Sequence, residues 1–357
     1  MRPGSGNKLT GRGTNNEDTR MMARVTLKDI ATATGLSVSS VSLALRGDKR
    51  FPKETLDRVR AAADSLGYIY NQGAADLRMS RNNTIAVCLG ELSNPIFNDM
   101  LISAEREIHR RGRRLLLGIT RESRERQADF LRQALQIGCE ALLLCPAYGT
   151  TRSDLDEILV RNGQPLLPTV LFFRSIEGFA APQVVSDEFH AGQLSARAAM
   201  DAGHRRMYWI GGGQETSASR LREAGAVSAF RRAGLEPVRI LHGPTSRAFG
   251  FEAATRILSE DGADDIALLC FSDLIALGVI SACHKMGRRP GEDVSVIGCD
   301  DMNEVQFAVP PLTTIRTDIE HIIERAMQAA VDREEAGLTT FEPKLVLRES
   351  LRVAPRT

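Results

Sequence analysis

Some residues have the types and spacing that chemistry would need, but most of them are better explained by structure. Gly211 to Gly213 follow an apolar run, as glycines do in nucleotide-binding loops, yet the rest of the phosphate-loop spacing and its lysine are missing. We therefore interpret these glycines as a tight strand-to-loop turn. Asp300 and Asp301 offer a carboxylate pair, but adjacent residues at a strand end point apart.

Metal and nucleophile chemistry has less support still. Six histidines and six cysteines show no metal-ligand spacing, and no serine lies in a nucleophile-elbow pattern. The cysteines lie mostly in or beside apolar runs, which favours buried, reduced thiols in a cytosolic protein. They are Cys88, Cys139, Cys145, Cys270, Cys283 and Cys299. The sequence thus predicts no catalytic residue, no metal and no cofactor, and the protein is expected not to be an enzyme.

The composition is that of an ordinary soluble chain with more than one domain. The chain has 357 residues, of which 43% are hydrophobic and 25% charged, and no apolar run approaches a membrane span in length. Residues 1–20 are rich in Gly, Asn, Thr and charge, so they fit neither a secretory signal nor a foldable unit. We expect disorder there, and a natural start at Met21 or Met22 instead of Met1 stays open.

The most specific signal lies between Val25 and Leu77, where the pattern predicts a helix, a tight turn and a second helix. Thr26 is placed to cap the first helix, which should end near Gly35. Ser37 is placed to cap the second, over residues 38–45. On that helix Val41 and Leu45 are expected to face inward, and the other candidates to face wholly or partly outward; these are Val38, Ser39, Ser42 and Leu43.

A third helix should complete a small core. Pro52 suits its first position and Gly67 its left-handed stop. Its apolar residues recur at helical spacing; they are Leu56, Val59, Ala63 and Leu66.

Positive charge is concentrated on the same stretch. Residues 20–81 hold 11 Lys and Arg against 6 Asp and Glu, whereas residues 82–357 hold 32 against 37. A helix-turn-helix lays its second helix in the major groove of DNA, and neutralisation of phosphates supplies much of its affinity. We therefore predict that this region binds DNA.

Two segments, TLKDIATATGLSVSSVSLALRG and RVRAAADSLGYIYN, resemble the DNA-binding headpiece of the lactose-repressor (LacI/GalR) family of bacterial transcription regulators. The similarity continues in order through SNPIF, VVSDEFHAG, DAGHRRM, SRLREAG, FSDLIALGVI, DVSVIGCDD and PPLTTIRTD, and so covers nearly everything after Ala23. The resemblance implies a cytoplasmic homodimer that regulates transcription, with repression as the favoured activity. Its partners would be double-stranded operator DNA of pseudo-palindromic sequence and a small-molecule effector.

The resemblance also implies a hinge helix over residues 71–81. In the family this helix inserts a leucine into the minor groove at the operator centre, which corresponds to Leu77, with Ala74 as a neighbouring contact. Such a wedge kinks the duplex at a cost of a few kcal/mol, which contacts on the bent DNA offset. A flexible linker is the alternative. The family usually has proline where Tyr70 stands, so the start of the hinge is expected to be less rigid here.

The positions that read base edges in the family fall on Val38, Ser39 and Leu43, where the best-known members have longer polar or basic residues. Ser39 can hydrogen-bond to several bases and the aliphatic side chains can contact thymine methyls, but bidentate contacts are absent. Our hypothesis is that recognition depends more than usual on the kinked centre and on phosphate contacts. The remaining predicted DNA contacts are Thr26, Ser37, Ser40 and Ser42.

From Thr84 onward apolar strands alternate with amphipathic helices, which predicts parallel sheets covered on both faces. The expected fold is a small all-α helix-turn-helix headpiece plus an α/β core of two doubly wound parallel-sheet subdomains, similar to periplasmic binding proteins. The second run should begin at PQVVSD, residues 182–187. The resemblance implies that the chain crosses three times between the two subdomains. The predicted parts are a tail (1–23), headpiece (24–70), hinge (71–81), first subdomain (82–184 and 316–340) and second subdomain (185–315 and 341–357).

Ligands of such sheets bind beyond the carboxyl ends of the strands. By resemblance, Asp300 hydrogen-bonds effector hydroxyls or ring nitrogens and Arg222 reaches the effector from the opposite wall; a capping role and a surface ion pair are the alternatives. Asp273 is expected to cap the helix that follows it. The other predicted effector contacts are Pro95, Ile96, Phe97, Phe173, Arg174 and Ser272.

At two positions the sequence differs from the residues with which members of the family usually recognise a sugar. Phe173 precedes Arg174 where sugar-binding members often have Asp or Asn, and Thr245 stands where some members are aromatic. Phe173 would instead stack on a ring. The effector is therefore expected to be a sugar or a related metabolite whose identity stays open.

Two alternative functions are those of a solute-binding protein and of a sugar-processing enzyme, each without DNA function. The first would need a secretory signal and would not carry Val25 to Leu77; the second would need an acid, a base or a metal in the cleft. Tetramers in the family use an extra leucine-rich helix, so the short RVAPRT after Leu351 favours a dimer. Whether the effector releases or promotes DNA binding, and which operator is bound, stay open.

Overall fold

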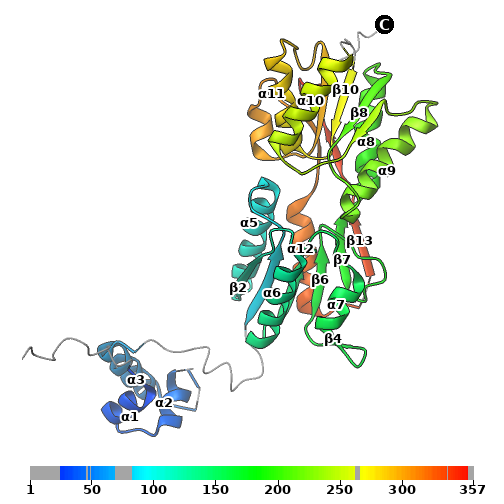
Figure 1. Ribbon diagram of the computed structural model, residues 1–357. Helices are drawn as coiled ribbons and strands as arrows, with labels where there is room; N and C mark the ends of the chain where they lie inside the picture. Colours follow the sequence, from blue (N-terminus) through cyan, green and yellow to red (C-terminus); the bar gives the residue numbers. More distant parts are fainter. Residues whose placement is uncertain are drawn as a thin grey trace, which may run out of the picture. The chain divides into compact units, whose positions relative to one another are not determined.

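The structure, a computed structural model, describes residues 25–45, 47–48, 50–68, 83–261, 266–335 and 337–352. The chain divides into two units, residues 1–78 and 79–357, and each is described by itself (Figure 1). The predicted tail, the hinge with Tyr70, Ala74 and Leu77, and residues 353–357 lie outside the described residues.

The described residues of the headpiece form three helices, α1 (Leu27–Thr34), α2 (Val38–Leu45) and α3 (Lys53–Leu66). The predicted caps are present, because the amide and the hydroxyl of Thr26 both donate to the Asp29 carboxylate at 2.8 Å. The Ser40 amide donates to the Ser37 hydroxyl at 3.1 Å. Gly35 and Gly67 end α1 and α3 in the left-handed conformation, as predicted.

The three helices bury one small core around Ile30, Val41, Ala44 and Val59. Three details of the prediction are wrong. Ser42 is only 6% exposed, because it stands on the same side of α2 as Leu45 three residues on. Leu66 is 38% exposed, since it is the last residue of α3 and lies past the core, and Pro52 precedes α3 instead of opening it.

The first sheet of the core unit is parallel throughout. Its order is β13-β7-β6-β3-β1-β2, with β13 (Gly337–Phe341), β7 (Pro182–Ser186), β6 (Thr169–Phe172), β3 (Ala141–Leu144), β1 (Thr84–Leu89) and β2 (Arg114–Ile119). One face packs against α5 (Pro95–Arg110) and α12 (Ile319–Asp332), and the other against α6 (Arg124–Ile137) and α7 (Arg152–Leu159) (Figure 1). A small hairpin, β4 (Val160–Arg161) and β5 (Gln164–Pro165), follows α7.

The second sheet has the order β14-β12-β11-β10-β8-β9. Its strands are β14 (Lys344–Val346), β12 (Thr313–Arg316), β11 (Val294–Asp300), β10 (Ile266–Cys270), β8 (Arg206–Ile210) and β9 (Arg239–Leu241), and β14 alone is antiparallel to its neighbour. Helices α8 (Glu188–Asp201) and α9 (Ser217–Arg232) cover one face, and α10 (Arg247–Asp261) and α11 (Asp273–Lys285) the other. A short 3-10 helix, η1 (Asn303–Phe307), follows β11.

The predicted start of the second run at residues 182–187 is wrong. These residues form β7, which pairs with β6 through Leu171 and Gln183 and so belongs to the first sheet. An apolar run has the same appearance in the sequence whether its strand joins the first or the second sheet. Only the hydrogen-bonded pairing with a neighbouring strand shows which sheet it joins. The predicted subdomain limits after residues 184, 315 and 340 each fall inside a strand, so the chain crosses between the sheets slightly later at each point.

Glycines bring the helices of the second sheet unusually close. A β-carbon at Gly192 on α8 would lie 1.8 Å from the Arg222 carbonyl oxygen on α9. A β-carbon at Gly225 on α9 would lie 1.9 Å from the Phe189 carbonyl oxygen on α8. The two helices therefore touch backbone to backbone, which only glycine permits at these positions.

All six cysteines are buried and free of disulfides, as predicted. Burial raises the pKa of each of these thiols, which keeps them neutral. Trp209 is a core residue in β8 at 1% exposure. Within the described part of the chain, none of the helices combines the length and apolar character that a membrane crossing requires.

Candidate ligand-binding cavity and DNA-binding surface

A cavity of about 350 Å³ lies where the carboxyl ends of the two sheets meet. The first sheet contributes residues that follow β1, β2, β3 and β6, and the second contributes α9 and residues at the ends of β9, β10 and β11. The lining residues are Glu91, Ser93, Asn94, Phe97, Arg121, Glu122, Tyr148, Phe173, Arg174, Ala218, Arg222, Pro244, Thr245, Ser246, Phe271, Ser272 and Asp300. This is where ligands of doubly wound sheets bind.

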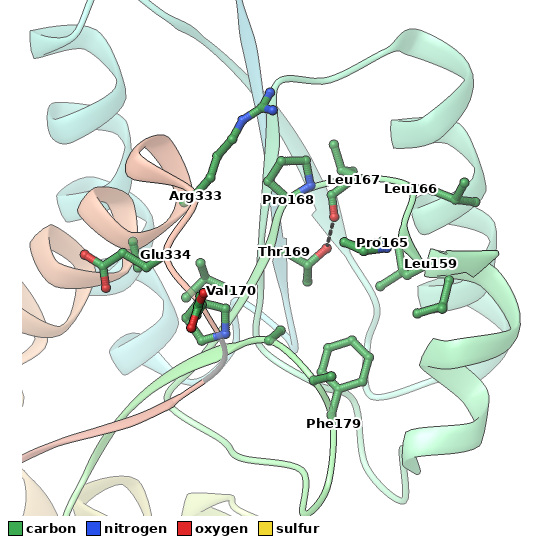
Figure 2. A pocket seen from close by; sticks show the side chains of 17 residues that line it. Leu159, Pro165, Leu166, Leu167, Pro168, Thr169, Val170, Phe179, Arg333 and Glu334 are labelled. Atoms are coloured by element: carbon green, nitrogen blue, oxygen red, sulfur yellow. Dashed lines mark hydrogen bonds between the residues drawn. The ribbon is translucent and has the colours of Figure 1, made fainter. Parts of the chain in front are cut away.

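A larger cavity, of about 490 Å³, lies at the opposite edge of the first sheet, where β6 and β7 begin. Its walls include the buried side chains of Leu159, Leu167, Val170 and Phe179, with Arg333 extending beside Pro168 (Figure 2). Its charged residues, Arg333, Glu334 and Glu335, come from one short segment after α12, whereas those of the smaller cavity come from both sheets. We therefore take the cavity between the sheets as the candidate site, despite its smaller volume.

Arg222 forms a buried ion pair on the second-sheet wall. Its Nε donates to Glu188 Oε2 at 2.7 Å and its Nη1 to the Phe271 carbonyl oxygen at 2.5 Å. The guanidinium lies 4.7 Å from the centre of the Phe271 ring, and Arg222 is 2% exposed. Burial opposes its charge, but the neighbouring anionic groups still raise its pKa. The alternative of a surface ion pair is therefore wrong.

Asp300 ends β11 with its side chain turned toward Arg222, 3.7 Å from Nη1. It is 5% exposed, has a φ of 118°, and burial raises the pKa of its carboxyl well above the usual range. Among the described residues no hydrogen-bond donor to this carboxyl is found. A plain capping role is wrong, because η1 begins only at Asn303 and Met302 precedes it.

Asp301 points elsewhere. Its oxygens bind Arg316 Nε and Arg348 Nη2, each at 2.6 Å. The two adjacent carboxylates are therefore not a pair, as expected for neighbours at a strand end.

Arg174 dominates the first-sheet wall. It makes a two-pronged ion pair with Glu122, at 2.8 and 3.1 Å, and its Nη1 donates to the Pro146 carbonyl oxygen at 2.8 Å. Its guanidinium lies 4.9 Å from the centre of the Tyr148 ring and 5.6 Å from that of Phe97. Phe97 in turn makes an edge-to-face contact with Phe173, with ring centres 6.0 Å apart.

Six of the eight predicted effector residues line the cavity, and two do not. Those that do are Phe97, Phe173, Arg174, Arg222, Ser272 and Asp300. Ile96 is 2% exposed and faces the core of the first sheet, and Pro95 is the first residue of α5. Successive helical residues diverge by about 100°, so one of the three consecutive positions faces the cavity.

The sequence did not mark Glu122, Tyr148 or Phe271 as cavity residues. Glu122 is one of many charged residues in TRESRERQ, and only the left-handed backbone at Arg121 (φ 51°) and Glu122 (φ 58°) turns it inward. No spacing pattern signals such a turn. An aromatic or charged residue directly after a predicted strand is a general signal that would have found Phe271, but Glu122 and Tyr148 lie three and four residues beyond the ends of β2 and β3.

Asp273 does not cap α11. Ser272 does, accepting from the Ile275 amide at 3.4 Å. The Asp273 carboxylate is fully buried and accepts from Thr314 Oγ1 at 2.5 Å and from the Met302 amide at 2.9 Å. Burial raises the pKa of Asp273 to about 7.

This raised pKa predicts a pH effect on stability. Because the folded chain holds the Asp273 proton more tightly than the unfolded chain does, this group's contribution is lost as pH rises from about 4 to about 7. Asp273→Asn cannot lose that proton. We expect its free energy of unfolding, relative to wild type, to improve by about 2–3 kcal/mol between pH 5 and pH 8. Urea unfolding at both pH values measures this, and an unchanged difference would contradict it.

Helix α2 offers a mixed surface for DNA. Val38 is 43% exposed, Ser37, Ser39 and Thr26 are exposed, and Ser40 and Leu43 are half-buried. Ser42 is buried and does not belong to this surface. Of the three predicted base readers, Val38 and Ser39 are therefore exposed and Leu43 is half-buried.

Comparisons with known proteins match both units. Residues 26–71 match the family described as bacterial regulatory proteins, lacI family, and residues 196–351 match the periplasmic binding protein-like domain. The HTH-type transcriptional repressor PurR of Pasteurella multocida (strain Pm70) is 28% identical over 335 residues, covering 92% of this chain and 98% of PurR.

Solved structures show the same fold. The Lac repressor dimer bound to operator and the anti-inducer ONPF matches with a TM-score of 0.82 at 23% identity, covering 93% of this chain and 100% of that one. The transcriptional regulator CelR in complex with cellobiose matches with a TM-score of 0.66 at 25% identity, covering 92% and 100%. The chain is therefore a DNA-binding regulatory protein that joins a headpiece of the lacI family to a periplasmic-binding-protein-like core, as its sequence predicted.

Proposed function

We propose that this protein is a cytoplasmic, homodimeric transcriptional repressor that binds a pseudo-palindromic operator and is controlled by a small molecule in the cavity between the sheets. The observation that carries the control mechanism is the cavity itself. Buried Asp300 and Arg222 face it from the second sheet, and Phe97 and Arg174 from the first. A regulator without an effector would have no need of such a lining.

The proposed effector is a sugar or a related metabolite. CelR binds cellobiose in its solved complex, which makes a sugar the natural first class to test. In this chain the Asp300 carboxyl is free to accept from hydroxyl or ring N–H groups, and Phe97 and Phe173 present apolar faces to a ring. Whether the effector releases or promotes DNA binding is an outcome of experiment.

Closure of the cavity would couple effector binding to DNA binding. Two hydrogen bonds cross from the first-sheet side to the second, from the Gly149 amide to the Glu215 carbonyl oxygen at 3.0 Å and from the Ser175 amide to Ser217 Oγ at 2.8 Å. A ligand that binds the closed and open forms unequally shifts this equilibrium. Effector and operator must then change each other's affinity by the same factor.

We propose no catalytic activity. Within the described ranges, no three His, Cys, Asp or Glu residues gather as a metal site would require. The buried arginines of the cavity already hold carboxylates, so Glu122 and Glu188 are poor candidates for an acid or a base. Turnover assays on a panel of sugars test this, and any product formed by the purified protein would overturn it.

The test of the DNA function is selection from a random duplex pool by the purified protein at moderate salt, read by sequencing. The expected result is an enriched palindrome with a flexible pyrimidine-purine step at its centre. No enrichment, with or without added metabolites, would contradict the repressor proposal and leave a binding protein of the solute-binding type.

Replacement of Leu77 tests the proposed minor-groove wedge. We expect Leu77→Ala to weaken binding to the selected operator by about tenfold or more, because the kinked centre loses its support. Ser39→Ala, which removes one exposed hydroxyl of α2, is the comparison and should cost less. Affinities come from fluorescence anisotropy with labelled operator, and a Leu77→Ala effect within about twofold would contradict the emphasis on the centre.

A further inference from the structure

Each of the two buried arginines that line the cavity is already matched by a buried carboxylate. Arg174 and Glu122 are 8% and 13% exposed at their side chains, and Arg222 and Glu188 are 3% and 3% exposed. An ion pair at this depth is costly to break, because separation leaves both charges desolvated. The charge of each guanidinium is therefore already matched within the protein, although the buried Nη2 of Arg222 makes no hydrogen bond among the described residues.

Glu122 is held in its position by several loops at once. Besides the two bonds from Arg174, it accepts from the Tyr148 amide at 3.1 Å. Gly90 leaves room for it, since a β-carbon there would lie 2.2 Å from Glu122 Oε1. The loops that follow β1, β2, β3 and β6 thus converge on one carboxylate.

Arg174 has little left to offer a ligand. Two of its donors serve Glu122 and a third contact goes to the Pro146 carbonyl oxygen, while the rings of Tyr148 and Phe97 lie against its guanidinium. The other charged residues of the lining are Glu91, Arg121 and Asp300, so the lining carries three arginines and three acids in all. The two buried arginines are therefore matched by carboxylates, and the exposed Arg121 is the one arginine of the lining without an ion pair among the described residues.

We propose that Glu122 determines the class of effector: by cancelling the charge of Arg174 inside the cavity, it restricts the site to uncharged ring molecules that carry hydroxyl or ring N–H donors for Asp300. This inference rests on the proposed effector role of the cavity, but not on the DNA function. It excludes sugar phosphates, nucleotides and carboxylic acids as effectors.

The decisive variant is Glu122→Gln, which keeps the size of the side chain and one carbonyl oxygen but releases the charge of Arg174. The probe is inorganic phosphate, titrated by calorimetry and by thermal unfolding at constant ionic strength. Wild type should show no saturable binding in the cavity. Glu122→Gln should bind phosphate at least about tenfold more tightly, as a charge-assisted contact to a freed guanidinium predicts.

Two controls separate this effect from a simple change of net charge. Glu91→Gln removes a carboxylate from the same lining, but Glu91 forms no ion pair among the described residues, so phosphate binding should stay at the wild-type level. Adding Arg174→Met to Glu122→Gln should abolish the gain. An equal gain in Glu91→Gln, or a gain that survives loss of Arg174, would overturn the proposal, as would a folded Glu122→Gln that gains nothing.

A second measurement needs no variant. Wild type is titrated with matched pairs, a hexose and its 6-phosphate and a nucleoside and its 5′-monophosphate. Tighter binding of either phosphorylated member overturns the proposal. Should Glu122→Gln fail to fold, Glu122→Ala frees the same guanidinium and carries the same expectation. Operator selection with wild type is independent of these results, so failure of the DNA function and failure of this inference are distinguishable.

Discussion

Replacement of Arg222 by methionine should reduce the free energy of unfolding by about 3–5 kcal/mol, the cost of removing one partner from a buried ion pair. Methionine fills a similar volume, so the loss comes mainly from charge. Glu188, 3% exposed, and Asp300, 5% exposed, would lose their common cation. The Phe271 carbonyl oxygen would lose its donor as well.

Urea unfolding followed by fluorescence measures this effect, because Trp209 is the single tryptophan and lies buried in the hydrophobic cluster that Phe271 packs against. The double variant Glu188→Gln and Arg222→Met should recover part of the loss, since it leaves fewer unmatched charges. A loss below about 1 kcal/mol in the single variant would place the pair among weak surface contacts.

The same variant should respond to pH. Burial already raises the pKa of Glu188 and of Asp300, and loss of Arg222 removes the group that opposes this rise. A carboxyl whose folded pKa is raised destabilises the fold as pH increases. The deficit of Arg222→Met should therefore be smaller at pH 5 than at pH 8.

Gly225→Ala should be among the most disruptive substitutions that add a single methyl group to the core unit. Its β-carbon would lie 1.9 Å from the Phe189 carbonyl oxygen, and a backbone atom cannot swing aside as a side chain can. Helices α8 and α9 must separate, which strains the Glu188 and Arg222 pair that joins them. Overpacking of this kind costs about 1–3 kcal/mol and occasionally more, and we expect the upper end.

Gly337→Ala is the matched control, because Gly337 has open space around its position and lies on the edge strand β13. It should change the free energy of unfolding by no more than about 0.5 kcal/mol. Thermal and urea unfolding of both variants decide the matter. Equal changes in the free energy of unfolding of the two variants would contradict the prediction, because they would mean that α8 and α9 accommodate the added methyl group at little cost.

The sequence predicted the fold well because buried parallel strands leave a direct trace. TIAVCL is buried at every position of β1, and IALLC at every position of β10. Such runs identify strands but not their neighbours, which is why β7 was assigned to the wrong sheet. The partner of a strand is decided by contacts between residues far apart in the chain.

Residue type and position alone could predict the candidate site only where a polar or charged residue ends or follows a strand, whereas Phe97 and Arg222, which lie in helices, were predicted by the family resemblance. Asp300 and Arg174 follow apolar runs and face the cavity as expected. Glu122 and Glu188, which match the two arginines, carry no signal because charged residues are common in such segments. Ser42 failed for a different reason, since the 100° step of a helix separates inside from outside only when the neighbouring helices are known.

The three crossings between the sheets bear on how the protein is made. The first sheet is completed by β13 (Gly337–Phe341) and the second by β14 (Lys344–Val346), so both depend on the same late segment of the chain. A nascent chain that still has these residues inside the ribosome has two unfinished sheets with open edges. Neither half can then be finished before the other during synthesis, and a premature stop before residue 337 damages both at once.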